Sequence, residues 1–375
     1  QNDVDFTNMG TLTVTSGTLS FAGTGGTGAL DIADATFTLT TSTVIFDSTN
    51  TGADFDITAP AGSLGTTTLT AVNNQVTFGN DAVLGDVTSS GASNHLWDAA
   101  LTASSIDHDG AGNFTVTDEA TVTGNIDVDG GDFTIGDGTG STFSGTSLSF
   151  INAGNVTIGN CTIDTAGTCT VQLDAADDFG GTITTGAGPT VVDIDSTGTV
   201  DDLTIADALT VPAGDTLTVD GDFDGSAAAS DIDGTLQFAG DADVSGGLDH
   251  TNGTVTFIDD AADSTHALTP AAADMGAGTF DILAGSGDTV NVAGAWNAAN
   301  TGNITVPSGT TWNFQNDVDF TNMGTLTVTS GTLSFAGNAG GTTLDIQGAT
   351  YSFTSETLIF DATNAGGAVT VSPPA

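Results

Sequence analysis

The chain contains a second copy of its own beginning. Residues 1–23 recur without a change at residues 315–337, and a diverged copy continues through residue 375. Self-similarity at a fixed period is typical of repeat architectures, which grow along one axis and bury their core between neighbouring units. The offset predicts one full repeat of a continuous structure over residues 1–314. Residues 315–375 are then the start of the next repeat, a copy of residues 1–61.

The diverged part of the copy indicates which positions the fold constrains. Of the 38 positions compared after residue 23, 16 are identical. Apolar residues replace apolar residues at alternate positions: Phe37 becomes Tyr351 and Val44 becomes Leu358. The acidic Asp54 is lost in the copy. This alternation is typical of strands with one buried face and one permissive outer face.

The charge balance limits the partners of the chain. It has no Lys or Arg and 47 acidic residues, all but Glu119 and Glu356 being aspartate, for a net charge of −47. Without basic residues there is no Lys or Arg to bind phosphate, which argues against nucleic acid and anionic membrane surfaces as partners. Trypsin-like proteases would find no cleavage site. The composition therefore favours an extracellular or cell-surface location.

The apolar content argues against disorder and against membrane insertion. Hydrophobic residues make up 38% of the chain and are spread evenly in short runs, so material for a core is present. No run approaches the 18 or more apolar residues of a membrane-spanning helix. We expect a soluble all-β protein.

The spacing of turn residues predicts the architecture. Gly is followed by four or five alternating residues at intervals of 19 and 23 from Gly112, and of 20, 19, 25, 24 and 22 from Gly214. A period of about 20–25 residues fits one coil of a right-handed parallel β-solenoid, or β-helix, with about three strands per coil. One 314-residue repeat would hold about 14 coils and be on the order of 70 Å long, with columns of Val, Ile, Leu and Phe inside. The alternative is a string of Ig-like β-sandwiches, which would recur near ~100 residues.

One coil motif resembles a known class of proteins. The pattern G-T-L-T-V-x-x-G-x-L-x-F spans Gly10–Phe21 and Gly324–Phe335. It resembles the repetitive β-helical regions of bacterial surface proteins, such as filamentous-haemagglutinin-like adhesins and autotransporter passengers. The resemblance implies a stalk, fibre or sheath component outside the cell.

Aspartates separated by one residue recur along the chain. The carboxylates of such a pair point to the same face of a strand. In stacked coils, neighbouring carboxylates would lie about 5 Å apart and repel by about 1 kcal/mol even in a water-like dielectric. We therefore expect bound divalent cations, with calcium as the candidate cofactor because it accepts several carboxylate oxygens in flexible geometry. The candidate ligands are Asp107, Asp109, Asp127, Asp129, Asp220, Asp222, Asp224, Asp231 and Asp233.

The alternative for these aspartates is a solvated surface that serves solubility and turn formation. We expect mild acid to be tolerated or even stabilising, because protonation relieves the repulsion between the carboxylates.

Two cysteines and four histidines complete the reactive side chains. Cys161 and Cys169 are eight residues apart, which in a secreted chain indicates a disulfide; the alternative is a pair of small buried residues. The histidines are isolated, form no metal-binding motif and are expected at the surface or in turns. They are His95, His108, His250 and His266.

Other surface features indicate binding more weakly. Outward Thr-x-Thr runs are similar to the threonine arrays of solenoid ice-binding proteins, although Thr also simply favours strands. N-x-S/T sequons are candidate glycan sites. They begin at Asn113, Asn155, Asn160, Asn252 and Asn303.

Together these features predict a structural protein and not an enzyme. Paired acids exist, but polysaccharide-cleaving β-helices also carry Arg or Lys near the substrate, and this chain has neither. We expect a component of an extracellular fibre or cell-surface filament that associates with itself, through tandem or head-to-tail repeats. The alternative is the stalk of a giant adhesin whose binding tip lies outside this chain.

Overall fold

The computed structural model is all-β, and the described residues contain strands and turns without a helix. It consists of two compact units, residues 1–190 and 191–375, which we describe separately. The described residues are 4–6, 8–22, 28–48, 54–71, 75–136, 140–150, 153, 156–159, 161–163, 168–172, 178–185, 191–194, 198–205, 208–226, 229–258, 264–272, 275–283, 287–297, 299–336, 342–361 and 369–372.

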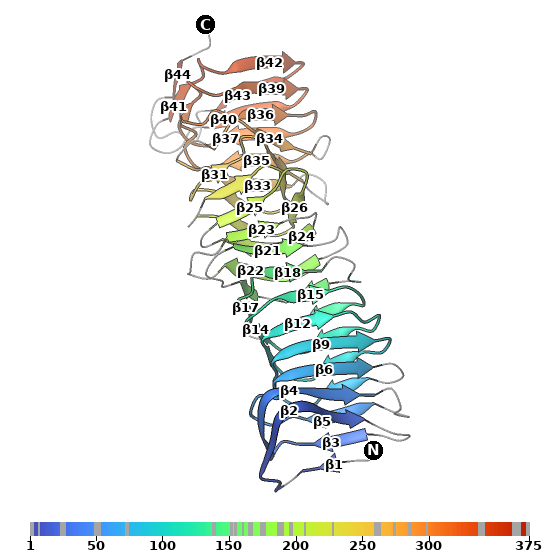
Figure 1. Cartoon of the computed structure of the whole chain (residues 1–375). Helices are drawn as coiled ribbons and strands as arrows, with labels where there is room; N and C mark the ends of the chain where they lie inside the picture. Colours follow the sequence, from blue (N-terminus) through green and yellow to red (C-terminus); the bar gives the residue numbers. More distant parts are fainter. Residues whose placement is uncertain are drawn as a thin grey trace. The chain divides into compact units, whose positions relative to one another are not determined.

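Within each unit the strands form parallel stacks that run along one axis (Figure 1). In the first unit, one stack consists of β1 (Val4–Asp5), β3 (Gly28–Asp31), β5 (Phe55–Thr58), β7 (Val76–Phe78), β10 (His95–Trp97), β13 (Phe114–Val116), β16 (Phe133–Ile135) and β19 (Val156–Ile158). A second consists of β8 (Ala82–Val83), β11 (Leu101–Ala103), β14 (Ala120–Val122), β17 (Ser141–Phe143), β20 (Cys161–Ile163) and β22 (Asp178–Thr185). A third consists of β2 (Thr11–Ala22), β4 (Thr36–Asp47), β6 (Thr66–Ala71), β9 (Asp86–Gly91), β12 (Ser105–His108), β15 (Ile126–Val128), β18 (Ser147–Ser149) and β21 (Thr168–Gln172).

The second unit is built in the same way. Its first stack consists of β24 (Gly198–Thr204), β26 (Thr216–Val219), β29 (Thr235–Phe238), β32 (Thr254–Phe257), β34 (Thr279–Ile282), β36 (Asn303–Val306), β39 (Thr325–Thr329) and β42 (Thr350–Thr354). Its second consists of β27 (Phe223–Asp224), β30 (Ala242–Asp243), β33 (Thr265–Thr269), β35 (Thr289–Val292), β37 (Thr311–Phe314), β40 (Thr332–Ala336) and β43 (Thr357–Asp361). The remaining strands are β23 (Val191–Ile194), β25 (Ala208–Val211), β28 (Ser230–Ile232), β31 (Leu248–Asp249), β38 (Val318–Asp319), β41 (Thr342–Asp345) and β44 (Val369–Ser372).

The register of the strands confirms the predicted coil. Phe114 pairs with Phe133, 19 residues later, and Phe133 pairs with Val156 after a further 23 residues. These intervals equal the glycine spacings in the same part of the sequence. Three parallel strands make up one coil between residues 95 and 172, as predicted. The chain is a β-solenoid, and the alternative of tandem Ig-like sandwiches is wrong, because such sandwiches consist of antiparallel sheets.

Aromatic rings form the predicted columns in the core. Phe114 is fully buried between Trp97 and Phe133, with ring centroids 4.5 Å and 5.2 Å away. In the second unit, Phe314 stacks on Phe335 at 5.5 Å. A parallel in-register sheet places equivalent residues of successive coils above one another, so one inward Phe per coil becomes a continuous column.

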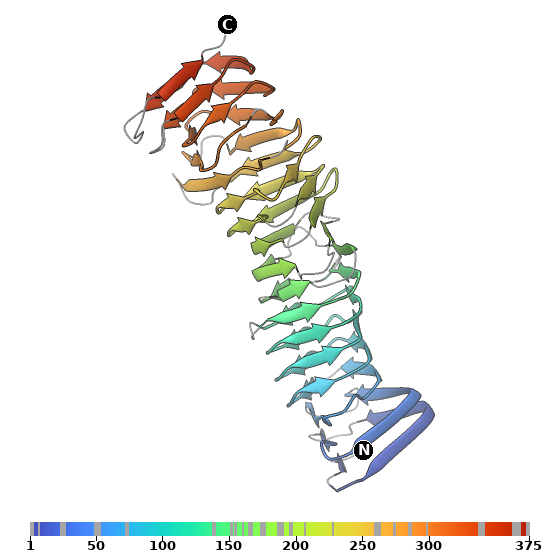
Figure 2. The same ribbon diagram turned by 90° about the vertical axis from the view of Figure 1, so that its left-hand side faces the viewer.

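The two copies of the repeat pair in the same register but bend differently. Thr18 pairs with Thr43 between β2 and β4, and the equivalent Thr332 pairs with Thr357 between β40 and β43. In the first copy β2 is one continuous strand of 12 residues, seen with β4 as two long blue ribbons in Figure 2. In the second copy the same residues form β39 and β40, separated by a corner at Ser330 with φ 57°.

The corner of the second copy rests on the coil that precedes it. A Cβ atom on Gly331 would lie 2.5 Å from the carbonyl oxygen of Pro307, and Thr332 donates its N–H to the carbonyl of Thr310 at 2.9 Å. At Gly17, the equivalent of Gly331 in the first copy, such a Cβ would have no heavy atom within 4 Å. Because the two sequences are identical here, the neighbouring coil decides whether the segment bends.

The aromatic column should carry a large part of the stability. We expect Phe114→Ala to lower the free energy of unfolding by about 3–5 kcal/mol, because it leaves a cavity between two rings. The neighbouring Thr115, whose side chain points outward, provides the control: Thr115→Ala should change stability by less than about 1 kcal/mol. Denaturant unfolding followed by tryptophan fluorescence measures both, and equal effects would contradict a core column.

Candidate functional site

Four of the predicted calcium ligands lie together on two adjacent coils. Asp107 of β12 is the register partner of Asp127 of β15, and Asp109 and Asp129 follow directly after these strands. All four side chains are exposed, and we call them the acidic patch. Partial burial raises the pKa of Asp107, and the negative charges of Asp109 and Asp127 raise it further. The sequence-based expectation of carboxylates facing each other across coils is met here.

The other five predicted ligands are not gathered into a loop. The carboxylate of Asp222 accepts the backbone N–H of Asp241 at 3.0 Å, and Asp224 accepts that of Ser226 at 3.0 Å. Asp233 accepts the side-chain N–H of Asn252 at 2.9 Å. In the part of the chain that the structure describes, no group of three or more His, Cys, Asp or Glu is placed to hold a metal ion. Calcium binding stays a prediction.

Asp220 and Asp231 complete this second group. The backbone N–H of Asp220 donates to the carbonyl of Val200 at 2.8 Å. Asp231 pairs in register with Asp249, and its pKa is raised by partial burial first and by the charge of Asp233 second.

Several carboxylates and amides have a structural role that the sequence analysis missed. Asp202 accepts the backbone N–H of Asp222 at 2.7 Å, one coil later. In the same way, Asn94 accepts the N–H of Asn113 at 3.0 Å, and Asn113 accepts that of Asp132 at 3.2 Å. Such ladders satisfy turn N–H groups between coils. The recurrence of Asn or Asp one position before an inward aromatic residue, at 19-residue intervals, was a signal that could have identified the second ladder.

All four histidines are buried, so their predicted surface location is wrong. Their side chains are at most 2% exposed. His108 donates from Nε2 to the carbonyl of Gly112 at 2.8 Å, and its Nδ1 therefore accepts the hydroxyl of Ser89 at 2.7 Å. His95 contacts His108 ring to ring, with centroids 5.9 Å apart. Burial lowers the pKa of His95 to about 4, helped by the nearby His108, and burial also lowers the pKa of His108.

The other two histidines are held in the second unit. His250 is hydrogen-bonded through Nδ1 to the carbonyl of Met275, and its ring lies 4.4 Å from that of Phe280. His266 donates its Nδ1–H to the carbonyl of Gly240 at 3.2 Å. Each histidine is two residues from an apolar residue and so points to the same side of the chain, as His266 does with Leu268 in β33. This two-residue spacing from an apolar residue was the sequence signal that could have predicted their burial.

The two cysteines are free thiols in the structure, so the predicted disulfide is not present there. Cys161 lies in β20 and Cys169 in β21, on different stacks of the coil, and both are buried. Burial raises the pKa of the Cys161 thiol to about 12 and that of Cys169 to about 11. Both thiols are thus protonated and unreactive at neutral pH.

Three of the candidate glycan sites use their amides inside the coil. Asn113 donates to the carboxylate of Asp132 at 3.0 Å, and Asn303 donates to the carbonyl of Ala277 at 3.0 Å. The amide of Asn252 is held by Asp233, as described above. Asn155 and Asn160 lie outside the described residues.

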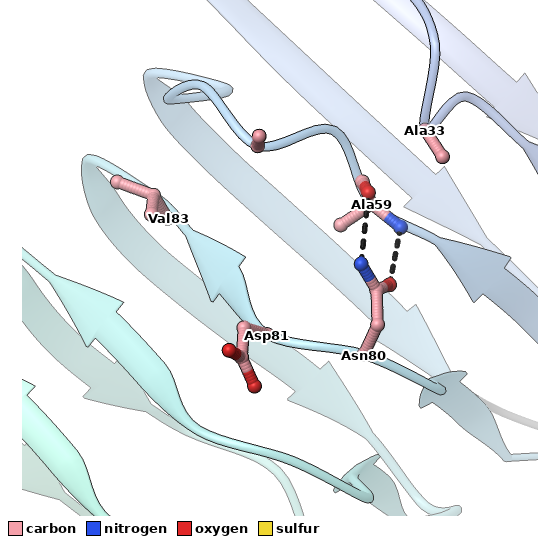
Figure 3. A pocket seen from close by; sticks show the side chains of 6 residues that line it. Ala33, Ala59, Asn80, Asp81 and Val83 are labelled. Atoms are coloured by element: carbon pink, nitrogen blue, oxygen red, sulfur yellow. Dashed lines mark hydrogen bonds between the residues drawn. The ribbon is translucent and has the colours of Figure 1, made fainter.

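One hollow of about 550 Å³ opens on the surface of the first unit (Figure 3). Asn80 uses both ends of its amide on the backbone of Ala59, at 2.7 and 3.0 Å. Asp81 accepts the N–H of Ala100 at 3.3 Å. The lining therefore offers one carboxylate and an amide that is already engaged, beside alanine and valine side chains.

Comparisons with protein-family models, curated proteins and solved structures found no match to this chain. Within the described residues, no helix has the length and apolar character needed to cross a membrane.

The buried histidines oppose the acid tolerance expected from the sequence and should make the protein sensitive to mild acid. A histidine with a pKa of about 4 when folded and 6.5 when unfolded stabilises the fold above pH 6.5, and this contribution is lost as pH falls toward 4. For His95 we expect a loss of roughly 3 kcal/mol over this window. The raised pKa values of Asp107 and Asp231 act in the opposite direction but belong to exposed groups, so their effect is smaller.

Unfolding free energies measured from pH 7 to 4 test this expectation. His95→Phe should flatten the pH dependence of stability, because it removes the titrating imidazole. The ring should fit, since phenylalanine already occupies the paired position, Phe114, on the next coil. Thr115→Val, the control, should leave the pH dependence of the unfolding free energy as it is in the natural chain. A stability that is constant or rises between pH 6.5 and 4 would contradict a buried, neutral His95.

The acidic patch should respond to calcium if the sequence-based hypothesis is correct. At low salt, millimolar calcium should raise the melting temperature by about 2 °C or more above sodium chloride of equal ionic strength. Asp107→Asn should reduce this gain, whereas Asp118→Asn, an exposed carboxylate outside the patch, should not. Equal melting temperatures in the two salts would count against specific calcium binding.

Proposed function

We propose that this chain is a structural component of an extracellular fibre or cell-surface filament, built from tandem or head-to-tail β-solenoid repeats. The observation that carries the proposal is the junction between the two copies. The first repeat ends at Phe314 of β37, and the second copy begins at Gln315 and stacks on it in parallel register. Ile304 of β36 pairs with Leu326 of β39, and Trp312 of β37 pairs with Leu333 of β40.

Burial at this junction is complete. Leu326 and Leu333 are at most 1% exposed, as are Ile304 and Trp312 beneath them. One repeat therefore follows the next within the same parallel stacks and the same apolar core, which is the property that a filament built from this repeat needs.

The charge distribution supports growth along the axis over association from the side. The inward positions are mostly apolar, whereas the acidic residues whose burial is described are all at least partly exposed except Asp288. The chain has 47 acidic residues and no basic residue to offset them. Like charges on the flanks repel neighbouring filaments at low and moderate salt. The absence of Lys and Arg also removes every site for trypsin-like proteases, which favours a location outside the cell.

Electron microscopy tests the filament. Particles of this chain and of a chain with one additional 314-residue repeat should have the same width, and the longer chain should gain about 70 Å in contour length. Antibodies against the chain should label intact cells of the source organism as strongly as permeabilised cells. Globular particles, or labelling that requires permeabilisation, would contradict the proposal.

A further inference from the structure

The last described coil ends in an apolar edge. In β43, the exposed fractions of Leu358, Ile359 and Phe360 are 43%, 40% and 46%, and Val371 of β44 is 39% exposed. Leu358, Phe360 and Val371 occupy inward positions, which elsewhere in the described core are covered by the next coil, whereas Ile359 lies between the first two on the outer side of the strand. Contiguous exposed apolar residues on strands mark a surface that binds another segment.

The first copy of the repeat shows which segment covers this edge. Its residues Val44, Phe46 and Ile57 are the equivalents of Leu358, Phe360 and Val371, and they are 0%, 0% and 1% exposed. They are covered because β4 pairs with β6 and β5 pairs with β7. The edge and its cover are thus both present in this chain, in different copies.

We propose that the edge formed by β43 and β44 is the joint on which a second copy of this repeat continues, through strands equivalent to β6 and β7. The proposal rests on the proposed function and specifies its assembly contact. The register follows from the first copy, where Thr43 pairs with Thr66 and Ile57 with Phe78. Thr357 should therefore pair with a second Thr66, and Val371 with a second Phe78.

The aromatic column gives an independent argument for this partner. In the first copy, Phe21 stacks on Phe46 with centroids 5.6 Å apart and planes at 12°, and Phe46 then contacts Phe78 at 5.5 Å. In the second copy, Phe335 stacks on Phe360 at 5.4 Å and 12°. The Phe335–Phe360 pair thus reproduces the geometry of the Phe21–Phe46 pair. The next ring in the column of the first copy is Phe78, and the equivalent position above Phe360 is where a second Phe78 would lie.

The backbone of β43 also directs N–H groups toward the position of a further strand. Thr357 donates its N–H to the carbonyl of Gly331 in the preceding coil at 3.0 Å. Because N–H groups alternate in direction along a strand, those of Leu358 and Phe360 face away from that coil. In the first copy the same alternation leads Ser48 to donate to the carbonyl of Thr70, at the end of β6, at 2.9 Å.

The opposite face of the repeat shows the complementary change. Leu12 and Val14 of the first copy are half-buried, whereas their equivalents Leu326 and Val328, which have β36 beneath them, are 0% exposed. A repeat thus gains burial on this face when another repeat precedes it. The joint already present within the chain therefore serves as the template for the proposed one.

Amide hydrogen exchange provides the test, because the two copies supply their own standard. Residues 43–47 and 357–361 are identical at four of five positions. In the present chain, the amides of Leu358 and Phe360 should exchange about 100-fold faster than those of Val44 and Phe46. In a chain extended after residue 375 by a second copy of residues 62–314, this difference should disappear.

Two matched chains control for nonspecific covering. Extension by a second copy of residues 1–61, which does not follow this edge in the repeat, should leave Leu358 and Phe360 in fast exchange. Phe360→Asp in the correctly extended chain should restore fast exchange at residues 357–361 and leave residues 43–47 protected.

The outcomes separate the joint from the filament. Unchanged exchange after the correct extension, equal protection by the wrong extension, or full protection in the unextended chain would each overturn the proposed joint. Protection by the correct extension together with globular particles in electron micrographs would uphold the joint and reject the filament. Filaments without this protection would reject the joint alone.

Discussion

Parallel pairing in register between successive coils is the interaction on which the rest of this structure depends. It places each residue above the equivalent residue of the preceding coil, so like residues meet like residues. For rings this is favourable, as in the stack of Trp97, Phe114 and Phe133. For side-chain amides it is also favourable, because each amide both donates and accepts. For carboxylates it is unfavourable, since Asp107 then faces Asp127.

The chain has no basic residue to offset the repulsion between its carboxylates, and hydrogen bonds take part of that role. Where aspartates occupy turns, their oxygens accept backbone N–H groups of the next coil, as Asp222 does from Asp241. Such bonds satisfy the backbone N–H groups of the turns and connect successive coils. Asp107, on the outer face of β12, is partly buried beside the charges of Asp109 and Asp127, and its pKa rises. The hydrogen-bond donors and the charges around an aspartate therefore decide whether its charge supports the fold, as for Asp224, or opposes it, as for Asp107.

The sequence was sufficient to predict the solenoid because its signals are local. The spacing of glycines indicates the length of a coil, and the alternation of apolar and polar residues indicates which side chains point inward. The pairing of Phe114 with Phe133 follows from both. Residue type alone predicts the histidines at the surface, but His95 and Trp97 are two residues apart in β10 and so point to the same, buried face. The acidic patch was predicted in part, since Asp107 and Asp127 occupy equivalent places in successive coils. The lack of a common calcium loop at Asp220, Asp222 and Asp224 was not predicted, because it depends on the hydrogen-bond partners of each residue.

The bend of the repeated segment was beyond any local argument. An identical sequence is one continuous strand in β2 and turns a corner at Ser330 in the second copy, so no property of the segment alone distinguishes the two. The difference is the preceding coil, whose Pro307 and Thr310 contact the corner. In a one-dimensional stack, stability resides largely in such interfaces between neighbours. Leu326 and Val328, which have a preceding coil beneath them, are fully buried, whereas the equivalent Leu12 and Val14 are half-buried, so a preceding repeat contributes to the packing of the next.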